Sequence, residues 1–519
     1  MEEILHRLRD SPSFAVLTAG SLFILWYIIS SIKSWYRLRN VPGPFLARFS
    51  YAWLAYRIIR GDVKRVFIKM HNKYGPIIRI GPNQVVTDDP DTLRSYMSAK
   101  TKYLRPDWNL GGRAHPDYDN LFCILDNDEH DALKAKTMGG YSGRELGSQF
   151  EPAVDHEIKS LLSLIRRKFL SNDNIPRPME VSEVMRYLTM DVITRLGYGK
   201  SFGHLTNGTD VYGWVTATGN YWMMALTLFI ELPLTRGMMF SRYGIGTMGP
   251  KLTDEMGPGK IMSVIHDIVS ERFRALREGD GKPKGDMVSS FIRNGLTREQ
   301  IEGEAMLQLI AGSDTTTNVL SATIMHLTST PQAYARLKNE IHQAIATGTA
   351  PADDLISYQQ CLKLPYLQAV IWEGFRMASA ATYSHYKEVP PGGDTLNGIT
   401  LPEGTMIGHS SGAMTQRTDI FGPDAAVFRP ERFSEVDEAT RQARLKACDI
   451  VFGGGRWTCS GKTVAIYEMN KVVFELMREF EFKLWNPRDG WKEWTYLAPK
   501  FEGMEVVVTD AVKGQGSIY

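Results

Sequence analysis

Cysteine is scarce in this chain, and the few cysteines are not grouped. Four occur among 519 residues, and none forms a CxxC pair or joins histidines at the spacing of a zinc site. This distribution argues against a disulfide framework and against a zinc site. An excess of either charge is also missing, because 60 basic residues stand against 58 acidic ones. That balance disfavours a nucleic-acid partner held by bulk electrostatics.

The sequence also lacks internal repeats and long low-complexity linkers, so residues 41–519 are predicted to form one large domain. Hydrophobic residues make up 43% and charged residues 23%, which are ordinary globular proportions. Helical patterns dominate, and 76-PIIRIGPNQVVT alternates apolar and polar residues around a Gly-Pro turn, which predicts a hairpin. The expected fold class is mainly α with minor β.

Charge is missing altogether from residues 14–32, FAVLTAGSLFILWYIISSI. This stretch is close to the roughly 20 helical residues that cross a bilayer core. The preceding MEEILHRLRD has mixed charge and no small-residue cleavage site follows, which favours an uncleaved anchor over a signal peptide. Lys33, Arg37 and Arg39 come directly after it, so the positive-inside rule predicts a single pass with a cytoplasmic body. Residues 1–40 are predicted to be a membrane anchor with a basic flank, followed by a stiff VPGP lead-in.

A long helix is predicted from Thr297, where T-R-E-Q has capping-box form, to just before Thr330 and Pro331. Thr330 is expected to cap the next helix, with Pro331 in its first position. About 30 residues would span roughly 45 to 50 Å. The middle is a poor helix former, because Gly312 costs about 1 kcal/mol relative to alanine and three β-branched threonines follow Asp314. Such weakness in an apolar helix indicates a functional site or, alternatively, a water-filled kink.

Glycine is concentrated around one cysteine, in 451-VFGGGRWTCSGK-462. Helical periodicity begins directly after Cys459, so the thiol is expected at a helix N-terminus, where backbone N–H groups and the helix dipole favour a thiolate. The glycines allow tight turns and leave room for a flat group over the sulfur. A single thiolate with an open face suits heme iron. A buried structural cysteine in a glycine turn is the alternative.

This segment resembles the heme-binding loop of the cytochrome P450 family, F-x-x-G-x-x-x-C-x-G, with Phe452, Gly455, Cys459 and Gly461 at its fixed positions. Three further motifs occur in the family's order: AGSDTT at 311–316, E-x-x-R at 373–376 and F-R-P-E-R-F at 428–433. E-x-x-R alone is very weak, but all four motifs in order cover essentially the whole chain. The resemblance implies the cytochrome P450 fold, with heme b between the long helix and the Cys459 loop.

The same resemblance implies a role for each matching residue. Cys459 would be the axial ligand of the heme iron, and Ala311 and Gly312 would border the oxygen site, where Gly312 opens a notch. Asp314 and Thr315 match the acid–alcohol pair that delivers protons to bound oxygen. A buried ion-pair cluster behind the heme would consist of Glu373, Arg376 and Arg432. Candidates for the heme propionates are Arg456, Trp457, His130, Lys134, His385 and Lys387, although lysine replaces the family's usual arginine at 134 and 387.

The implied function is a monooxygenase that uses O2 to oxidise a mid-sized, mostly apolar small molecule, and the sequence most resembles fungal secondary-metabolite members. Four segments would contact the substrate: residues 105–122, 212–229, 311–315 and 378–386. The second segment, rich in aromatic residues and methionine, is equally consistent with plain core or a membrane-contact face. The alternatives are a heme-thiolate isomerase, dehydratase or oxidative coupling enzyme, and a non-enzymatic heme sensor. The intact pair Asp314–Thr315 argues against each of them.

The electron source is expected to be a second protein, because no flavin or nicotinamide domain is visible in the sequence. For a microsomal member, the resemblance implies an NADPH-dependent flavoprotein reductase in the same endoplasmic reticulum membrane. Arg456, Lys462 and Lys471 are predicted to present a basic face to this partner near Cys459.

Overall fold

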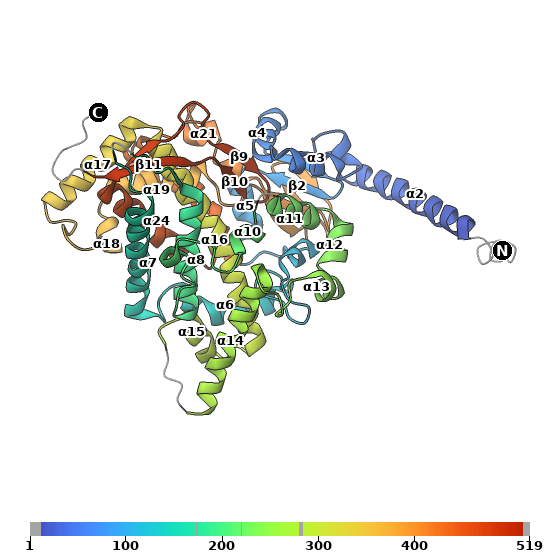
Figure 1. Cartoon of the computed structure of the whole chain (residues 1–519). Coiled ribbons are helices and arrows are strands. Elements are labelled where there is room, and N and C mark those ends of the chain that lie inside the picture. Colours follow the sequence, from blue (N-terminus) through green and yellow to red (C-terminus); the bar gives the residue numbers. More distant parts are fainter. Residues whose placement is uncertain (1–11, 173–174, 220, 280–283, 512–519) are drawn as a thin grey trace.

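The computed structural model describes residues 12–172, 175–219, 221–279 and 284–511 and confirms a mainly helical fold with minor sheet (Figure 1). The helices are α2 Pro12–Arg37, α3 Ala52–Arg60, α4 Val63–Tyr74, α5 Pro90–Met97, α6 Asn127–Tyr141, α7 Phe150–Leu164, α8 Val181–Tyr198, α9 His204–Asn207, α10 Trp214–Ala217, α11 Trp222–Glu231, α12 Pro233–Met239, α13 Arg242–Met248, α14 Gly257–Arg277, α15 Met287–Arg293, α16 Arg298–Thr328, α17 Pro331–Ala346, α18 Tyr358–Cys361, α19 Pro365–Met377, α20 Ser411–Met414, α21 Thr418–Phe421, α22 Glu431–Ser434, α23 Glu438–Asp449 and α24 Lys462–Glu479.

The strands form small sheets. The largest has the order β1-β2-β7-β4, in which β2 and β7 are parallel and the other pairs antiparallel. The antiparallel pair β1 and β2 is the hairpin predicted from the sequence. The remaining sheets have the orders β3-β11-β8, β10-β9 and β5-β6. The strand bounds are β1 Ile77–Gly81, β2 Gln84–Thr87, β3 Met179–Glu180, β4 Ser384–Glu388, β5 Asp394–Leu396, β6 Ile399–Leu401, β7 Met406–His409, β8 Phe480–Leu484, β9 Lys492–Thr495, β10 Pro499–Glu502 and β11 Glu505–Asp510.

The long central helix α16 begins where the sequence predicted. Thr297 and Gln300 form the reciprocal capping box, and the helix then runs without a break to Thr328. The weak middle is therefore helical throughout. The prediction for the next helix is only partly right: Pro331 is the first residue of α17, but the Thr330 side chain makes no capping hydrogen bond. Helices α8, α14, α19 and α24 pack against α16, which places it at the centre of the body.

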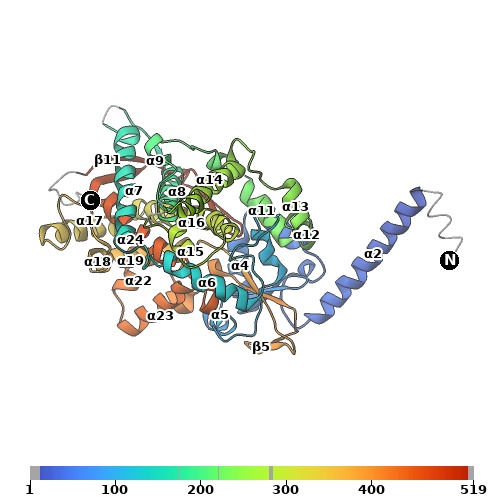
Figure 2. The ribbon, with the colours of Figure 1, turned by 90° about the horizontal axis from the view of Figure 1, so that it is seen from below.

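The apolar helix α2 projects from the body, as two perpendicular views show (Figures 1 and 2). It is longer than the predicted span because the helix continues through the basic flank to Arg37. Over Val16–Arg37 none of its most apolar window is buried. The base of α2 is fixed by Arg79 of β1, whose buried guanidinium donates to the carbonyl oxygens of Ser34 (2.9 Å), Leu38 (3.2 Å) and Arg48 (3.1 Å). These bonds join the lead-in to the sheet.

Candidate functional site

Cys459 differs from the other three cysteines in its surroundings. Cys123, Cys361 and Cys448 are buried, whereas the Cys459 side chain is exposed. Desolvation by the surrounding protein atoms nevertheless raises the pKa of the Cys459 thiol. The backbone N–H groups of Gly461 and Lys462 point at the sulfur and act in the opposite direction on this pKa. The thiol therefore lies at the start of α24 with donors prepared for a thiolate.

Two glycines of the loop have reasons other than the space that the sequence indicated. Gly455 has φ +55, and a Cβ there would come 2.0 Å from the carbonyl oxygen of Met97. Gly453 has φ +77, and its Cβ would come 2.8 Å from the carbonyl oxygen of Trp457. Left-handed backbone and close contact with main-chain atoms both require glycine. The tight turns and close approach expected of these glycines are therefore confirmed, and they let the loop fold on itself and against the end of α5.

The middle of α16 has an exposed patch within an otherwise buried helix. Ile310 is 40% exposed and Ala311 is also exposed, whereas the helix residues before and after them are mostly buried. Thr315 lies one turn further along, and its hydroxyl donates to the Ala311 carbonyl oxygen at 2.6 Å. Helix α24, which follows the Cys459 loop, packs against α16.

Gly312 and Asp314 face α8. A Cβ on Gly312 would come 3.1 Å from Cγ1 of Ile193, so the glycine allows α8 to approach α16 closely. Close packing of α8 against α16 is therefore sufficient to explain the glycine at 312, without the notch that was predicted for the oxygen site. The Asp314 carboxylate lies 3.0 Å from Nε of Arg186, also on α8, and both side chains are slightly exposed. The predicted acid therefore has a basic partner and retains a route to solvent.

Glu373, Arg376 and Arg432 meet in one fully buried cluster. Arg376 donates to both carboxylate oxygens of Glu373 at 2.7 Å, and Arg432 donates to Oε1 at 3.0 Å. The Arg429 backbone N–H adds a further bond to Oε1 at 2.7 Å. The remaining guanidinium N–H groups donate mainly to main-chain carbonyls, including Thr415, Ala425 and Val427. This network joins α19 to the segment 424–432 with its charged groups paired.

A second basic cluster surrounds the Cys459 loop. Lys134 donates to the carbonyl oxygens of Arg456 (2.7 Å) and Thr458 (2.6 Å). The Lys387 ammonium lies 4.4 Å from the centroid of the Trp457 ring. Arg456 lies 3.6 Å from the Asp131 carboxylate and donates to the Ala99 carbonyl oxygen at 2.9 Å. The structure therefore brings together four of the predicted propionate contacts.

Burial and repulsion between neighbouring cations lower the pKa values of the basic side chains in this cluster. Burial lowers the pKa of Lys134 to about 8 and that of His130 to about 4, with Arg105 contributing to both shifts. The pKa of Lys387 falls well below its usual value for the same reasons. His385 pairs with His409, Nδ1 to Nε2 at 3.1 Å, and its pKa is also lowered by burial and by neighbouring His409 and Lys387.

Arg105 belongs to this cluster and was missed in the sequence, where it was assigned only to a substrate loop. It donates to the carbonyl oxygens of Leu121 (2.5 Å) and Ile124 (3.1 Å), and burial lowers its pKa to about 10. The Leu121 N–H in turn donates to buried Glu304 on α16 at 2.6 Å. No local pattern marks Arg105, because its neighbours come from α6, β4 and α16.

The donor set fits heme. Nε of Arg105, Nε of Arg456 and Nε1 of Trp457 are buried without a hydrogen-bond partner among the described residues. Buried donors of this kind cost free energy unless an acceptor is present. A flat group with two carboxylates would supply acceptors to the basic cluster while its metal meets one soft sulfur ligand.

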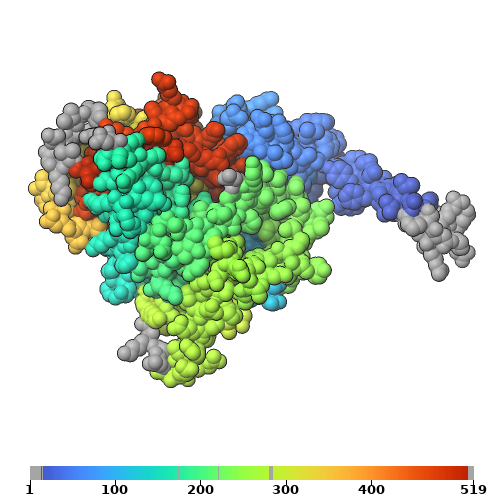
Figure 3. Space-filling view, in the orientation of Figure 1, coloured from blue at the N-terminus to red at the C-terminus, as the bar shows by residue number. Residues whose placement is uncertain are grey.

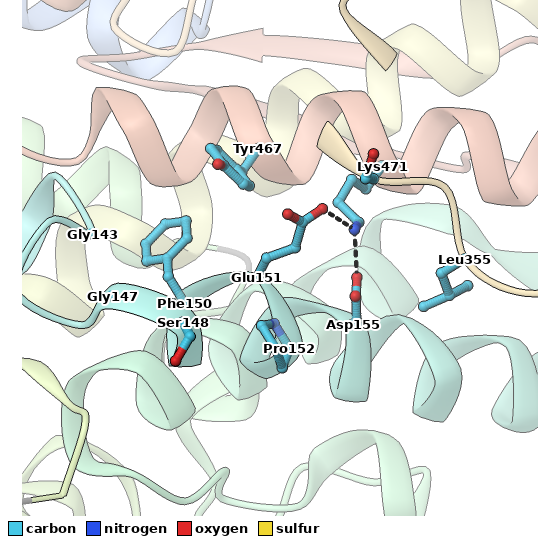
Figure 4. Close-up of a pocket in the computed structure, with 11 residues that line it drawn as sticks. Gly143, Gly147, Ser148, Phe150, Glu151, Pro152, Asp155, Leu355, Tyr467 and Lys471 are labelled. Carbon is cyan, nitrogen blue, oxygen red and sulfur yellow. Dashed lines mark hydrogen bonds and ion pairs between the residues drawn. The ribbon is translucent and has the colours of Figure 1, made fainter. Parts of the chain in front are cut away.

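Lys471 does not present the predicted basic face. It is almost fully buried and pairs with Glu151 and Asp155 of α7, each at 2.6 Å. These groups border a cavity of about 440 Å³ between α7 and α24 (Figure 4). Lys462 pairs with Asp449. The prediction is wrong for Lys471 because two carboxylates, distant in sequence, neutralise it.

The segment 212–229 divides its side chains between two environments. Met223, Met224, Leu226 and Leu228 pack against an internal core, whereas Trp222 is 44% and Phe229 37% exposed. The segment is therefore partly core and partly surface. Figure 3 shows the surface formed by α11, α12 and α13 on the same side of the body as the base of α2.

Comparison with known proteins places these features in a family. The model of the cytochrome P450 family matches residues 41–495. Cytochrome P450 monooxygenase ABA1 of Pyricularia oryzae is 40% identical over 490 residues, which cover 93% of this chain and 94% of the relative. Cytochrome P450 monooxygenase aba1 of Botryotinia fuckeliana is 38% identical over 453 residues, 87% of each chain. A pisatin demethylase of Fusarium vanettenii is 29% identical over 497 residues, 94% of each chain.

Proposed function

The chain belongs to the cytochrome P450 family of oxygen-incorporating oxidoreductases, and from this premise we propose that it is a membrane-anchored heme-thiolate monooxygenase that oxidises a mid-sized, mostly apolar small molecule. Its relatives are fungal monooxygenases of the secondary-metabolite type. The observation that carries the proposal is Cys459, the one exposed thiol among four, just before the start of α24, a helix that packs against α16.

Cys459 would bind the iron of heme b, with Gly461 and Lys462 N–H groups stabilising its negative charge. Arg105, Arg456 and Trp457 would donate to the propionates with the nitrogen atoms that have no hydrogen-bond partner in the part of the chain that the structure describes. Heme, when bound, supplies the reductive activation of O2 and the oxidation of a C–H bond. The protein supplies the orientation of the group, the basic edge and the apolar surface above it.

Asp314 and Thr315 would move protons toward bound oxygen. The Thr315 hydroxyl directs its proton to the Ala311 carbonyl, so its oxygen lone pairs can accept a hydrogen bond from water. Asp314 contacts Arg186 and remains partly exposed, so its carboxylate can exchange that partner for solvent. Glu373, Arg376 and Arg432 would act only on the scaffold, because no part of their cluster is exposed.

The anchor would hold the enzyme in the endoplasmic reticulum membrane with its body in the cytoplasm. Helix α2 carries an exposed apolar surface, and further exposed apolar side chains occur on the body. They include Phe45, Leu46, Tyr56, Ile59, Tyr221, Leu234, Met238 and Tyr243. Electrons from NADPH would arrive through a separate flavoprotein reductase near the Cys459 loop, where Arg456 and Lys462 keep partial exposure.

The proposal is tested by the carbon monoxide difference spectrum of the reduced protein. We expect the red-shifted Soret band of a thiolate-ligated heme in the wild type and in Cys361→Ala, which alters the buried cysteine of α18. Cys459→Ser should keep the fold but lose that band. A heme-loaded wild type without the band, or a Cys459→Ser protein that retains it, contradicts the thiolate assignment.

A further inference from the structure

A buried carboxylate outside the heme site joins three segments that are distant in sequence. Glu231, the last residue of α11, is fully buried. Its Oε1 accepts from the indole Nε1 of Trp108 at 3.1 Å, and its Oε2 accepts from the side-chain amide of Gln84 at 3.0 Å. The Tyr383 hydroxyl lies close to the same carboxylate. Glu231 therefore connects α11 to β2 and to the short 3-10 helix η2, Asp107–Gly112.

A second connection lies beside the first. Arg236 of α12 is almost fully buried, and its Nη2 is 3.1 Å from both carboxylate oxygens of Asp107. Its Nη1 donates to the Ile230 carbonyl oxygen at 2.7 Å. Gly111 permits this approach, because a Cβ there would come 2.6 Å from Ile230 Cγ1. The turn η2 is thus held against α11 and α12 by polar bonds at one end and by backbone contact at the other.

Trp108 carries this connection toward the candidate heme site. Its ring lies 5.3 Å from the Tyr386 ring, 6.0 Å from Phe122 and 6.4 Å from His385, measured between centroids. His385 in turn has φ 52 and belongs to the neighbourhood of the basic cluster. One tryptophan ring therefore separates the buried carboxylate from the edge of the site.

The free energy needed to bury the Glu231 carboxylate indicates that this residue has a specific structural role. Burial raises the pKa of the Glu231 carboxyl to about 7, against the effect of the Gln84 and Trp108 hydrogen bonds and of Arg236. A buried carboxylate costs free energy that an apolar residue would not. The short helix η2 contains two glycines and has few bonds of its own, so it needs external contacts to keep one position.

We propose that Glu231 is a positioning residue that fixes η2, through Trp108, as a wall of the substrate chamber and thereby limits the size of molecule that reaches the heme. This inference rests on the proposed function. Loss of the Glu231 bonds would leave η2 held only by Arg236 and by the contact of Gly111 with Ile230, so η2 would move more easily without any change at Cys459 or in the basic cluster. Large ligands would then pass more easily, while small ligands, which do not need the wall to move, would be unaffected.

The first measurement is hydrogen exchange of the full chain, which does not depend on catalysis. Glu231→Gln turns one acceptor oxygen into a donor that faces Trp108 or Gln84. Loss of one such bond corresponds to about tenfold faster exchange in peptides covering 105–112 and 222–239. Trp108→Phe, which removes the indole N–H together with part of the ring, should show at least the same local effect. Glu475→Gln is the matched control, because Glu475 is equally buried and its pKa is also raised to about 7, but it lies in α24 and accepts from Ile356.

The second measurement is the binding rate of two azoles followed by the heme spectrum. For Glu231→Gln we expect the on-rate of the bulky azole clotrimazole to rise about tenfold while that of imidazole stays unchanged. Equal changes for both azoles, or exchange that rises throughout the chain as in a general loss of stability, overturn the proposal. If the protein binds no heme, the proposed function fails, but hydrogen exchange still tests the role of Glu231. Unchanged exchange at 105–112 in Glu231→Gln refutes that role. Faster exchange confined to 105–112 and 222–239 supports the connection between Glu231 and η2.

Discussion

Two buried clusters of cations differ in how their charge is balanced. Around Glu373, two arginines share one carboxylate and donate their other N–H groups to carbonyl oxygens, with neither guanidinium exposed. Around the Cys459 loop, Arg105, Lys134, Lys387 and Arg456 have Asp131 as a nearby carboxylate, and two of their N–H groups have no partner among the described residues.

The difference separates a structural cluster from a binding cluster. Where a protein supplies its own counter-charge, removal of one member leaves an unpaired buried ion. Where a protein leaves buried cations and donors without partners, folding does not offset the free energy lost in their desolvation. Binding of an anionic ligand can offset it. The two clusters should therefore respond oppositely to removal of charge, which the following variants test.

The largest effect is expected at the balanced cluster. Glu373→Gln would remove the carboxylate that the buried Arg376 and Arg432 share and leave Asp424 as the partner of Arg432. This should lower the free energy of unfolding by about 3–5 kcal/mol. Urea unfolding followed by circular dichroism measures this loss. The control is Glu438→Gln, which breaks the exposed pair with Arg441 and should cost less than about 1 kcal/mol. Similar losses for both variants would contradict the structural role of Glu373.

The unmatched cluster should lose ligand affinity instead. Arg105→Met removes a charged donor, so the affinity of the protein for heme should fall about tenfold to a hundredfold. Transfer of heme from the protein to apomyoglobin measures this affinity. The heme-free protein should keep its stability or gain some. Arg113→Met is the comparison, because Arg113 of the same loop is already paired with Asp119 at 2.6 Å. Stronger heme loss in Arg113→Met than in Arg105→Met would refute this assignment.

Lys387 gives a sharper test, because its substitution should change the stability of the heme-free protein and its heme affinity in opposite directions. Lys387→Met replaces a buried ammonium whose partners among the described residues are two carbonyl oxygens and the Trp457 ring. The unfolding free energy of the heme-free protein should rise by about 1 kcal/mol, whereas heme affinity should fall about tenfold. Differential scanning calorimetry and heme titration of the same preparation measure the two quantities. A fall in both would show that Lys387 serves the fold alone.

The smallest effect is expected at Trp457. Trp457→Phe keeps the ring under the Lys387 ammonium but removes the indole N–H, which has no partner among the described residues. The free energy of unfolding of the heme-free protein should change by less than about 0.5 kcal/mol. The affinity for heme should fall about threefold to tenfold. Unchanged affinity at the precision of heme titration would remove Trp457 from the propionate contacts.

Local sequence was a good guide where one segment decides the outcome. The start of α16 at Thr297, the β1–β2 hairpin, the apolar helix and the mainly helical fold all follow from periodicity, capping and turn residues. Local sequence failed for the side chains that face several segments. Lys471 looked like a surface cation on α24, yet Glu151 and Asp155 of α7 bury and neutralise it.

The sequence by itself determined the membrane-length apolar helix, the long central helix and the one cysteine followed directly by a helix. It also supplied the motifs that resemble the cytochrome P450 family. Only the tertiary structure decided that Arg105 joins the basic cluster, that Gly312 packs on α8 and that Glu231 ties η2 to α11. The physical reason is that helix starts and turns depend on a few adjacent residues, whereas the partners of a buried charge are brought together from distant segments when the chain folds.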